Sequence, residues 1–165
     1  MVDMVTVNLS EDKKNRLIER TQKMLEATVD DVMRVEGLLT VDAGDLVARA
    51  ARIILENGIL GLLVLKDGKA YRMLTTFDLL KLSYDEAFDE SRDYFRMRVG
   101  DLVADKELIS VPPGTRLREC LNIMLEARLR TIPVIEEGEV RGILSLVDLV
   151  TWYRNTHDEV RTGRI

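Results

Sequence analysis

Two tandem copies of one segment make up most of the sequence, and this repeat limits the folds that the chain can adopt. Shifting the sequence by 70 residues aligns 29–80 with 99–150 without a gap, and thirteen of the 52 positions are identical. Chance would give about three or four identities for residues of average usage. The first members of the identical pairs are Val29, Asp31, Leu38, Val41, Gly44, Ile53, Leu55, Glu56, Val64, Gly68, Leu74, Asp78 and Leu79. A segment of this length buries too little surface to be comfortably stable alone, so we expect the copies to pack together as a pseudo-symmetric pair.

Each copy predicts the element order β-α-β-β-α, and thus an α+β fold. In the first copy we expect a strand around Val41, a helix from about 45 to 57, strands over 62–65 and 71–75, and a helix from near Asp78. Asp67-Gly68 and its counterpart Glu137-Gly138 predict hairpin turns, and Asp-Gly is the stronger signal because it suits a type I′ turn. Cys120 falls opposite Ala50 on an apolar helix face and is interpreted as a core residue.

The repeats divide the chain into five expected parts. These are 1–27, an N-terminal extension with an extra helix; 28–82, the first repeat; 83–97, a connecting helix; 98–152, the second repeat; and 153–165, a C-terminal tail. Ser10 followed by two acidic residues is typical of a helix start. For both extra helices we expect docking onto the repeats or onto a second subunit; recognition of a different protein is the alternative.

Composition excludes several classes of function. The 24 Lys and Arg residues against 29 Asp and Glu give a net charge of −5, without the concentrated basic face that nucleic acid requires. One cysteine and one histidine, His157, cannot form a disulfide scaffold or a usual zinc site, and they leave little for nucleophilic catalysis. No phosphate-binding Gly-rich loop of the Walker type occurs. We therefore expect a protein that is not an enzyme.

The sequence also predicts a soluble protein with no membrane partner. The most apolar window, 53–65, is interrupted by Glu56 and Asn57 and is too short to cross a bilayer. The N-terminus lacks the basic and apolar regions of a signal peptide. These features favour a cytoplasmic location.

A hydroxyl residue followed three positions later by a carboxylate closes each copy, as Ser145 with Asp148 and as Thr75 with Asp78. One interpretation is structural, because Asp is a preferred N-cap and its loss costs about 0.5–2 kcal/mol. The other is ligand binding. A helix N-terminus attracts phosphate, and a carboxylate at its rim accepts hydrogen bonds from sugar hydroxyls, which would suit a ribonucleotide.

The doubled pattern resembles a tandem pair of cystathionine-β-synthase (CBS) domains, the Bateman module, over about 29–150. The segments that carry the resemblance are Ser110-Val-Pro-Pro-Gly114-Thr115, Arg130-Thr-Ile-Pro133-Val134 and Gly142-Ile-Leu-Ser145-Leu-Val-Asp148 in the second copy, and Thr40-Val-Asp-Ala-Gly44-Asp45 and Thr75-Thr-Phe-Asp78 in the first. The first copy departs from the family in having Leu63 where Pro is frequent and Arg72 where Gly is frequent.

The resemblance implies a regulatory module that binds an adenosine-containing ligand, AMP, ADP, ATP or S-adenosylmethionine, between its repeats, with no required cofactor. The residues it implies are Asp148 and Asp78 for the ribose, Ser145 and Thr75 as adjacent hydroxyl contacts, Arg130, Thr131, Leu60 and Gly61 at the pocket border, and Thr40 and Ser110 near the base. Arg130 suits phosphate whereas Leu60 does not, so the Asp148 site ranks ahead of the Asp78 site. A solvated surface arginine is the alternative for Arg130, and Arg72 would either reach a phosphate or fill the first pocket.

The resemblance further implies a homodimer in which the repeat pairs stack through their helices. The regulated protein is expected to be a separate polypeptide. The alternative function is a structural dimerisation or protein-interaction module with unoccupied pockets, and an ion-linked sensor is a third possibility with little support.

Overall fold

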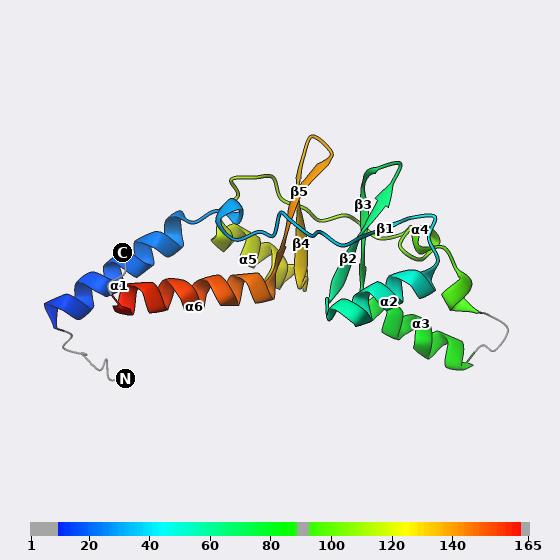
Figure 1. Ribbon diagram of the computed structural model, residues 1–165, viewed down its shortest axis with the longest axis horizontal. Helices are drawn as coiled ribbons and strands as arrows, with labels where there is room; N and C mark the ends of the chain where they lie inside the picture. The colour runs from blue at the N-terminus through cyan, green and yellow to red at the C-terminus, as the bar shows by residue number, and fades with distance from the viewer. Residues whose placement is uncertain (1–9, 89–92, 163–165) are drawn as a thin grey trace, which may run out of the picture.

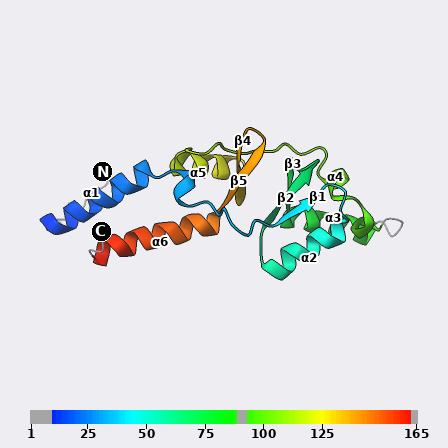
Figure 2. The same ribbon diagram turned by 45° about the horizontal axis from the view of Figure 1, so that its top comes forward.

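The computed structural model describes residues 10–88 and 93–162, and every structural statement below concerns that part of the chain. Its two halves each contain a β-hairpin, and α1 and α6 lie side by side and extend away from the rest (Figures 1 and 2). The elements are α1 Glu11–Glu26, η1 Val29–Asp31, β1 Thr40–Asp42, α2 Val47–Asn57, β2 Gly61–Lys66, β3 Lys69–Thr75, α3 Thr76–Phe88, η2 Tyr94–Arg96, α4 Val99–Leu102, α5 Leu117–Glu126, β4 Thr131–Glu136, β5 Glu139–Ser145 and α6 Leu146–Thr162. The predicted α+β fold with two repeats is confirmed.

Both hairpins form with the same turn. Asp67 and Gly68 have φ values of 52° and 77°, and Glu137 and Gly138 have 52° and 84°. Positive φ at both central residues is the signature of a type I′ turn, whose twist matches that of the paired strands. The second turn therefore forms although Glu is a poorer residue for it than Asp.

The first strand is longer in the first repeat than in the second, and the reason is chemical. β1 pairs in parallel with β2, and the Ala43 N–H extends the pairing by donating to the Leu65 carbonyl at 2.7 Å. Pro113 stands at the corresponding position and has no N–H to donate. The second copy accordingly keeps only a parallel bridge between Val111 and Val134.

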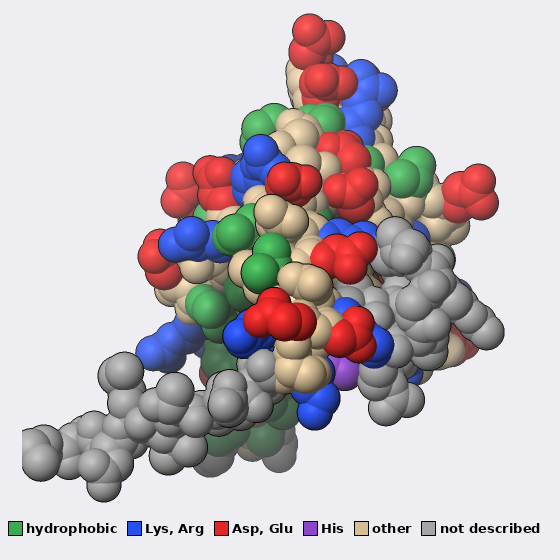
Figure 3. Space-filling model, turned by 90° about the vertical axis from the view of Figure 1, so that its left-hand side faces the viewer, with side chains coloured by type: hydrophobic (Ala, Val, Ile, Leu, Met, Phe, Trp, Pro, Cys, Tyr) green, Lys and Arg blue, Asp and Glu red, His purple; other side chains and the backbone are tan. Residues whose placement is uncertain are grey.

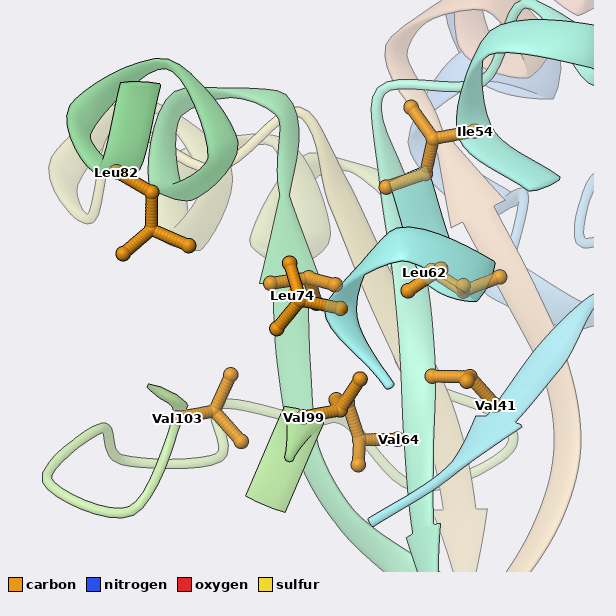
Figure 4. Packing of buried hydrophobic residues seen from close by; sticks show 10 residues of the cluster. Val41, Ile54, Leu62, Val64, Leu74, Leu82, Val99 and Val103 are labelled. Carbon is orange, nitrogen blue, oxygen red and sulfur yellow. The ribbon is translucent and has the colours of Figure 1, made fainter. Parts of the chain in front are cut away.

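Each repeat's opening segment packs into the core of the other repeat. Val99 and Val103, from the start of the second copy, lie beside Val64 and Leu74 of the first hairpin (Figure 4). Reciprocally, Val29 is buried in the cluster formed by the second copy, with Val29 N–H donating to the Thr115 carbonyl at 2.8 Å. The packing units are therefore not contiguous in sequence.

Two expected segments differ from the sequence-based boundaries. Of the expected connecting helix over 83–97, the described residues show two parts: residues up to Phe88 continue α3, and 94–96 form the 3₁₀ turn η2, while residues 89–92 lie outside the described part. The expected tail from 153 is instead helical as far as Thr162, as the continuation of α6. The cause is packing against α1, which offers α6 a neighbour that local sequence does not reveal.

The buried thiol confirms the structural interpretation of Cys120. Its side chain is fully buried in the cluster of the second repeat, as is Ala50 in the first. Burial raises the pKa of the Cys120 thiol to about 11, which disfavours the thiolate that would act as a nucleophile.

The end of the molecule formed by α1 and α6 carries interspersed acidic and basic side chains rather than a patch of one sign (Figure 3). Within the described residues, no helix has the length and apolar content needed to span a bilayer.

Candidate functional site

A pocket of about 210 Å³ lies between the two repeats. The first repeat contributes the segments before β1 and between α2 and β2, and the second contributes the start of β4 and the junction of β5 with α6. The lining residues are Arg34, Gly37, Leu38, Leu39, Asn57, Gly58, Ile59, Leu60, Gly61, Arg130, Thr131, Ile143, Ser145, Leu146, Val147 and Asp148.

Asp148 is held at the pocket by a reciprocal capping arrangement. Its Oδ2 accepts hydrogen bonds from the Ser145 N–H at 2.9 Å and from the Ser145 hydroxyl at 2.5 Å, and its own N–H donates to Ser145 Oγ at 3.2 Å. Ser145 is thus the N-cap and Asp148 the third residue of the helix, which corrects the expectation that Asp148 itself is the N-cap. The two interpretations of Asp148 are compatible, because capping uses Oδ2 and leaves Oδ1 toward the pocket side, where Arg34 Nη2 lies 3.5 Å away.

Two arginines line the same pocket as this carboxylate. Arg34 and Arg130 both line the pocket, and the Arg34 side chain is 56% exposed. Two of the three amides in the first turn of α6 have acceptors: the Leu146 N–H donates to the Arg130 carbonyl at 3.0 Å, and the Asp148 N–H donates to Ser145 Oγ. The third, the Val147 N–H, has no acceptor among the described residues. A helix N-terminus with a free amide and two guanidinium groups nearby can bind an anion such as phosphate.

The opposite wall follows from the way α2 ends. Gly58 adopts the left-handed conformation with φ of 59°, and its neighbour Ile59 donates its N–H to the Ile54 carbonyl at 3.2 Å. The turn brings Leu60 and Gly61 to the pocket. A Cβ on Gly61 would lie 3.7 Å from the Cβ of Thr131, so the two repeats approach closely at this point.

Six of the residues expected at the site line this pocket, and four do not. The six are Asp148, Ser145, Arg130, Thr131, Leu60 and Gly61. Thr40 lies in β1, one residue beyond the lining residue Leu39, and Ser110 is exposed just before Val111. The other two, Thr75 and Asp78, form the corresponding arrangement in the first repeat.

The Asp78 site has the same cap but a different partner. Asp78 Oδ2 accepts hydrogen bonds from the Thr75 N–H at 2.7 Å and the Thr75 hydroxyl at 2.6 Å. Lys106 Nζ lies 2.6 Å from the same oxygen. The carboxylate is thus already paired with an ammonium group.

The Arg72 side chain packs against its neighbour Tyr71. Its guanidinium lies over the Tyr71 ring, 4.5 Å from the ring centroid, and Nη1 donates to the Tyr71 carbonyl at 2.7 Å. Its Nε is buried without a hydrogen-bond partner among the described residues.

Several residues that line the pocket were not expected there from the sequence. Arg34 belongs by sequence to the first copy, but its backbone N–H donates to the carbonyl of Ile143, in the second copy, at 2.8 Å. Arg34 therefore reaches the pocket because the opening segment of the first copy packs against the second. The turn at Asn57-Gly58 could have been predicted, because a glycine that follows a helix is typical of a helix end and a turn.

The described residues contain no group of three or more His, Cys, Asp or Glu side chains that could hold a metal ion. The pocket instead offers guanidinium and amide donors, which suit an anion, and a carboxylate acceptor, which suits the hydroxyl groups of a ligand.

Comparisons with known proteins show the family of this fold. A family model described as "CBS domain" matches residues 29–85 and 99–155. The chain is 27% identical to the mitochondrial CBS domain-containing protein CBSX3 of Arabidopsis thaliana, over 80% of this chain and 67% of that protein. It is also 27% identical to the SNF1-related protein kinase regulatory subunit gamma-like PV42a of the same plant, over 51% of this chain but only 24% of that protein. The crystal structure of CBSX2 in complex with AMP superposes with a TM-score of 0.66 at 28% identity, covering 78% of this chain and 96% of that one.

Proposed function

Because the chain belongs to the CBS-domain family, with two tandem domains, we propose that it is a non-catalytic regulatory module that binds an adenosine-containing ligand between its repeats. The candidate ligands are AMP, ADP, ATP and S-adenosylmethionine. The observation that carries the proposal is the inter-repeat pocket at Asp148, with a carboxylate positioned by Ser145 and guanidinium groups beside it.

The carboxylate is proposed to hold the ribose. Asp148 is mostly buried, with 18% of its side chain exposed, and among the described residues the polar contact of Oδ1 is the one to Arg34 at 3.5 Å. A carboxylate oxygen in this setting accepts hydrogen bonds from the two neighbouring hydroxyls of a ribose, and such charge-assisted bonds contribute about 1.5–3 kcal/mol each. Leu38, Leu39 and Ile59 offer apolar surface for the base.

Arg130, Arg34 and the Val147 N–H are proposed to receive phosphate. They lie with Asp148 in one pocket, so a single nucleotide would use all of them. The family relationship supports a nucleotide ligand and a regulatory role, because the CBSX2 structure, which covers most of this chain, is named as a complex with AMP, and PV42a is named as a regulatory subunit.

Thermal unfolding with a ligand panel tests the proposed function. A ligand at 100 times its Kd stabilises the folded protein by about 2.7 kcal/mol, which for a chain of this size raises Tm by roughly 5–11 °C. We expect such a shift with at least one of AMP, ADP, ATP and S-adenosylmethionine, and a smaller one with adenosine if phosphate is bound.

GMP serves as the control, since it carries the same ribose and phosphate on a different base. An unchanged Tm with all four ligands would contradict the proposed function. It would favour the interaction module with unoccupied pockets.

Signalling is proposed to pass through a homodimer. Large apolar side chains are exposed at equivalent positions of both repeats: Leu55 and Leu125 are 79% and 65% exposed, Phe77 and Val147 71% and 64%, and Leu80 and Val150 65% and 68%. Because the same apolar pattern occurs twice about the pseudo-symmetry, a second copy of the chain has a complementary pattern to offer.

Charged substitutions among these exposed apolar residues are expected to dissociate the dimer. The double variant Leu80→Glu, Val150→Glu buries unpaired carboxylates in the proposed interface, so we expect dimerisation to weaken at least 100-fold, as measured by sedimentation equilibrium. Lys81→Glu with Thr151→Glu, at exposed neighbouring positions, is the matched control. A monomeric wild-type chain at micromolar concentration would contradict the dimer.

The regulated protein is proposed to be a separate polypeptide. The proposed compartment of this chain is the cytoplasm. One relative, CBSX3, is named as mitochondrial.

A further inference from the structure

The helices α3 and α6 occupy equivalent positions in the two repeats, but their exposed rows of side chains differ. The row on α3 is hydrophobic and, with the spacing i, i+3, i+7, lies along one side of the helix. It consists of Phe77, Leu80 and Tyr84, which are 71%, 65% and 66% exposed. The same row on α6 consists of Val147, Val150 and Arg154. The first repeat therefore presents a ridge of large hydrophobic side chains, which we call the α3 ridge, whereas the row on the second repeat ends in a charge.

The second repeat carries a hydrophobic groove of about 400 Å³ between α1, α5 and α6. Apart from Arg118, the described side chains that line it are aliphatic or aromatic. Those with the most exposed surface are Leu25, Leu121, Val150 and Tyr153, at 54%, 39%, 68% and 46%. The groove is continuous with the dimer face proposed above, because Val150 belongs to both. A second copy of the chain is therefore the occupant that this surface favours.

The charges beside the two surfaces are opposite in sign. Asp85 and Glu86 directly follow the α3 ridge, whereas the exposed residues Arg118 and Arg154 lie at the groove and at the end of the α6 row. Opposite charges favour the approach of two surfaces, and like charges oppose it. The electrostatics therefore favour an α3 ridge, and not a second α6 row, against the groove.

Two-fold symmetry allows two orientations of the dimer, and they differ in what enters the groove. In a parallel dimer the second repeats meet, so the α6 row of one copy faces the groove of the other. Arg154 would then be brought toward hydrophobic side chains and toward a second Arg118, which costs free energy. In an antiparallel dimer Tyr84 takes the place of that arginine, and its aromatic ring suits a hydrophobic surface.

We propose that two copies pair in the antiparallel orientation, with the α3 ridge of each copy in the hydrophobic groove of the other. The inference rests on the proposed homodimer and assigns its orientation. Each chain supplies one ridge and one groove, so the two contacts close the dimer without leaving either surface exposed.

Chemical cross-linking between two single-cysteine variants tests the orientation. Leu80→Cys places a thiol on the α3 ridge, and Leu121→Cys places one in the groove, while the natural Cys120 is buried. With a short bismaleimide, we expect a mixture of the two variants to give cross-linked dimers and each variant alone to give none. Leu80→Cys mixed with Arg141→Cys, an exposed position on β5, is the control for random collision and is expected to give none.

Cross-linking of Leu80→Cys to itself would overturn the inference in favour of the parallel orientation. So would a wild-type dimer, established by sedimentation equilibrium, whose variant mixture gives no cross-link. A monomeric wild type would instead overturn the proposed dimer, and the effect of AMP on Tm reports separately on ligand binding. Should either leucine variant not fold or dimerise, the exposed neighbours Ser83→Cys and Arg118→Cys decide by the same comparison.

Discussion

The Asp148→Ala variant is expected to bind AMP 100-fold to 10,000-fold more weakly than the wild type. Two charge-assisted hydrogen bonds to ribose hydroxyls contribute about 3–6 kcal/mol together, and each 1.4 kcal/mol corresponds to a factor of ten in Kd. Isothermal titration calorimetry gives the affinity directly. The large effect follows from the position of Asp148, which is mostly buried and held by Ser145 so that one carboxylate oxygen remains for a ligand.

Asp78→Ala is the matched control for this measurement. It removes the same capping carboxylate in the other repeat, so both variants lose a cap contribution of about 0.5–2 kcal/mol in the free energy of unfolding. Only the Asp148 variant is expected to lose AMP binding. Equal affinity in the wild type and both variants would show that the two carboxylates serve helix capping alone.

Gly142→Arg, which copies Arg72 of the first repeat, is expected to lower the free energy of unfolding by about 2–6 kcal/mol. A Cβ at position 142 would lie 2.6 Å from Met33 Sδ and 2.9 Å from the Arg34 carbonyl oxygen. Overpacking typically costs 1–3 kcal/mol. The Arg34–Ile143 pair also loses its two backbone hydrogen bonds, at 2.8 and 2.9 Å, which contribute about 0.5–1.5 kcal/mol each.

Thermal unfolding measures this effect as a fall in Tm of roughly 4–24 °C. AMP affinity should fall in parallel, because the displaced segment carries Arg34 and leads to Leu38 and Leu39 of the pocket. Arg141→Ala is the control: its ion pair with Glu136 is exposed, so its loss costs at most about 1 kcal/mol. A Gly142→Arg variant as stable as Arg141→Ala would show that the 33–34 segment can move away from β5 at little cost.

The local parts of the fold could be predicted from the sequence. The hairpins follow from Gly68 and Gly138, because both turns need positive φ at that position. The position of Asp148 one turn into the helix, and not at its cap, could not be distinguished from spacing alone, since Ser145 is an equally good N-cap.

The non-local parts could not be predicted in this way. Arg34 and Lys106 reach their carboxylates only because each opening segment crosses to the other repeat. The helical or strand periodicity of residues 29–34 and 99–106 does not indicate which repeat's hydrophobic core these residues pack into. The extension of α6 to Thr162 likewise depends on α1, a neighbour more than a hundred residues away in the sequence.

The crossing of the opening segments has an evolutionary consequence. Val29 and Val99 are equivalent residues, and each completes the core that the other copy's hairpin begins. This is the geometry of a domain-swapped dimer whose two chains have been joined end to end. A single-copy ancestor with the same contacts would have had to pair with a twin to close its core. Joining two such copies in one chain turns an assembly that depends on concentration into one that the chain carries within itself.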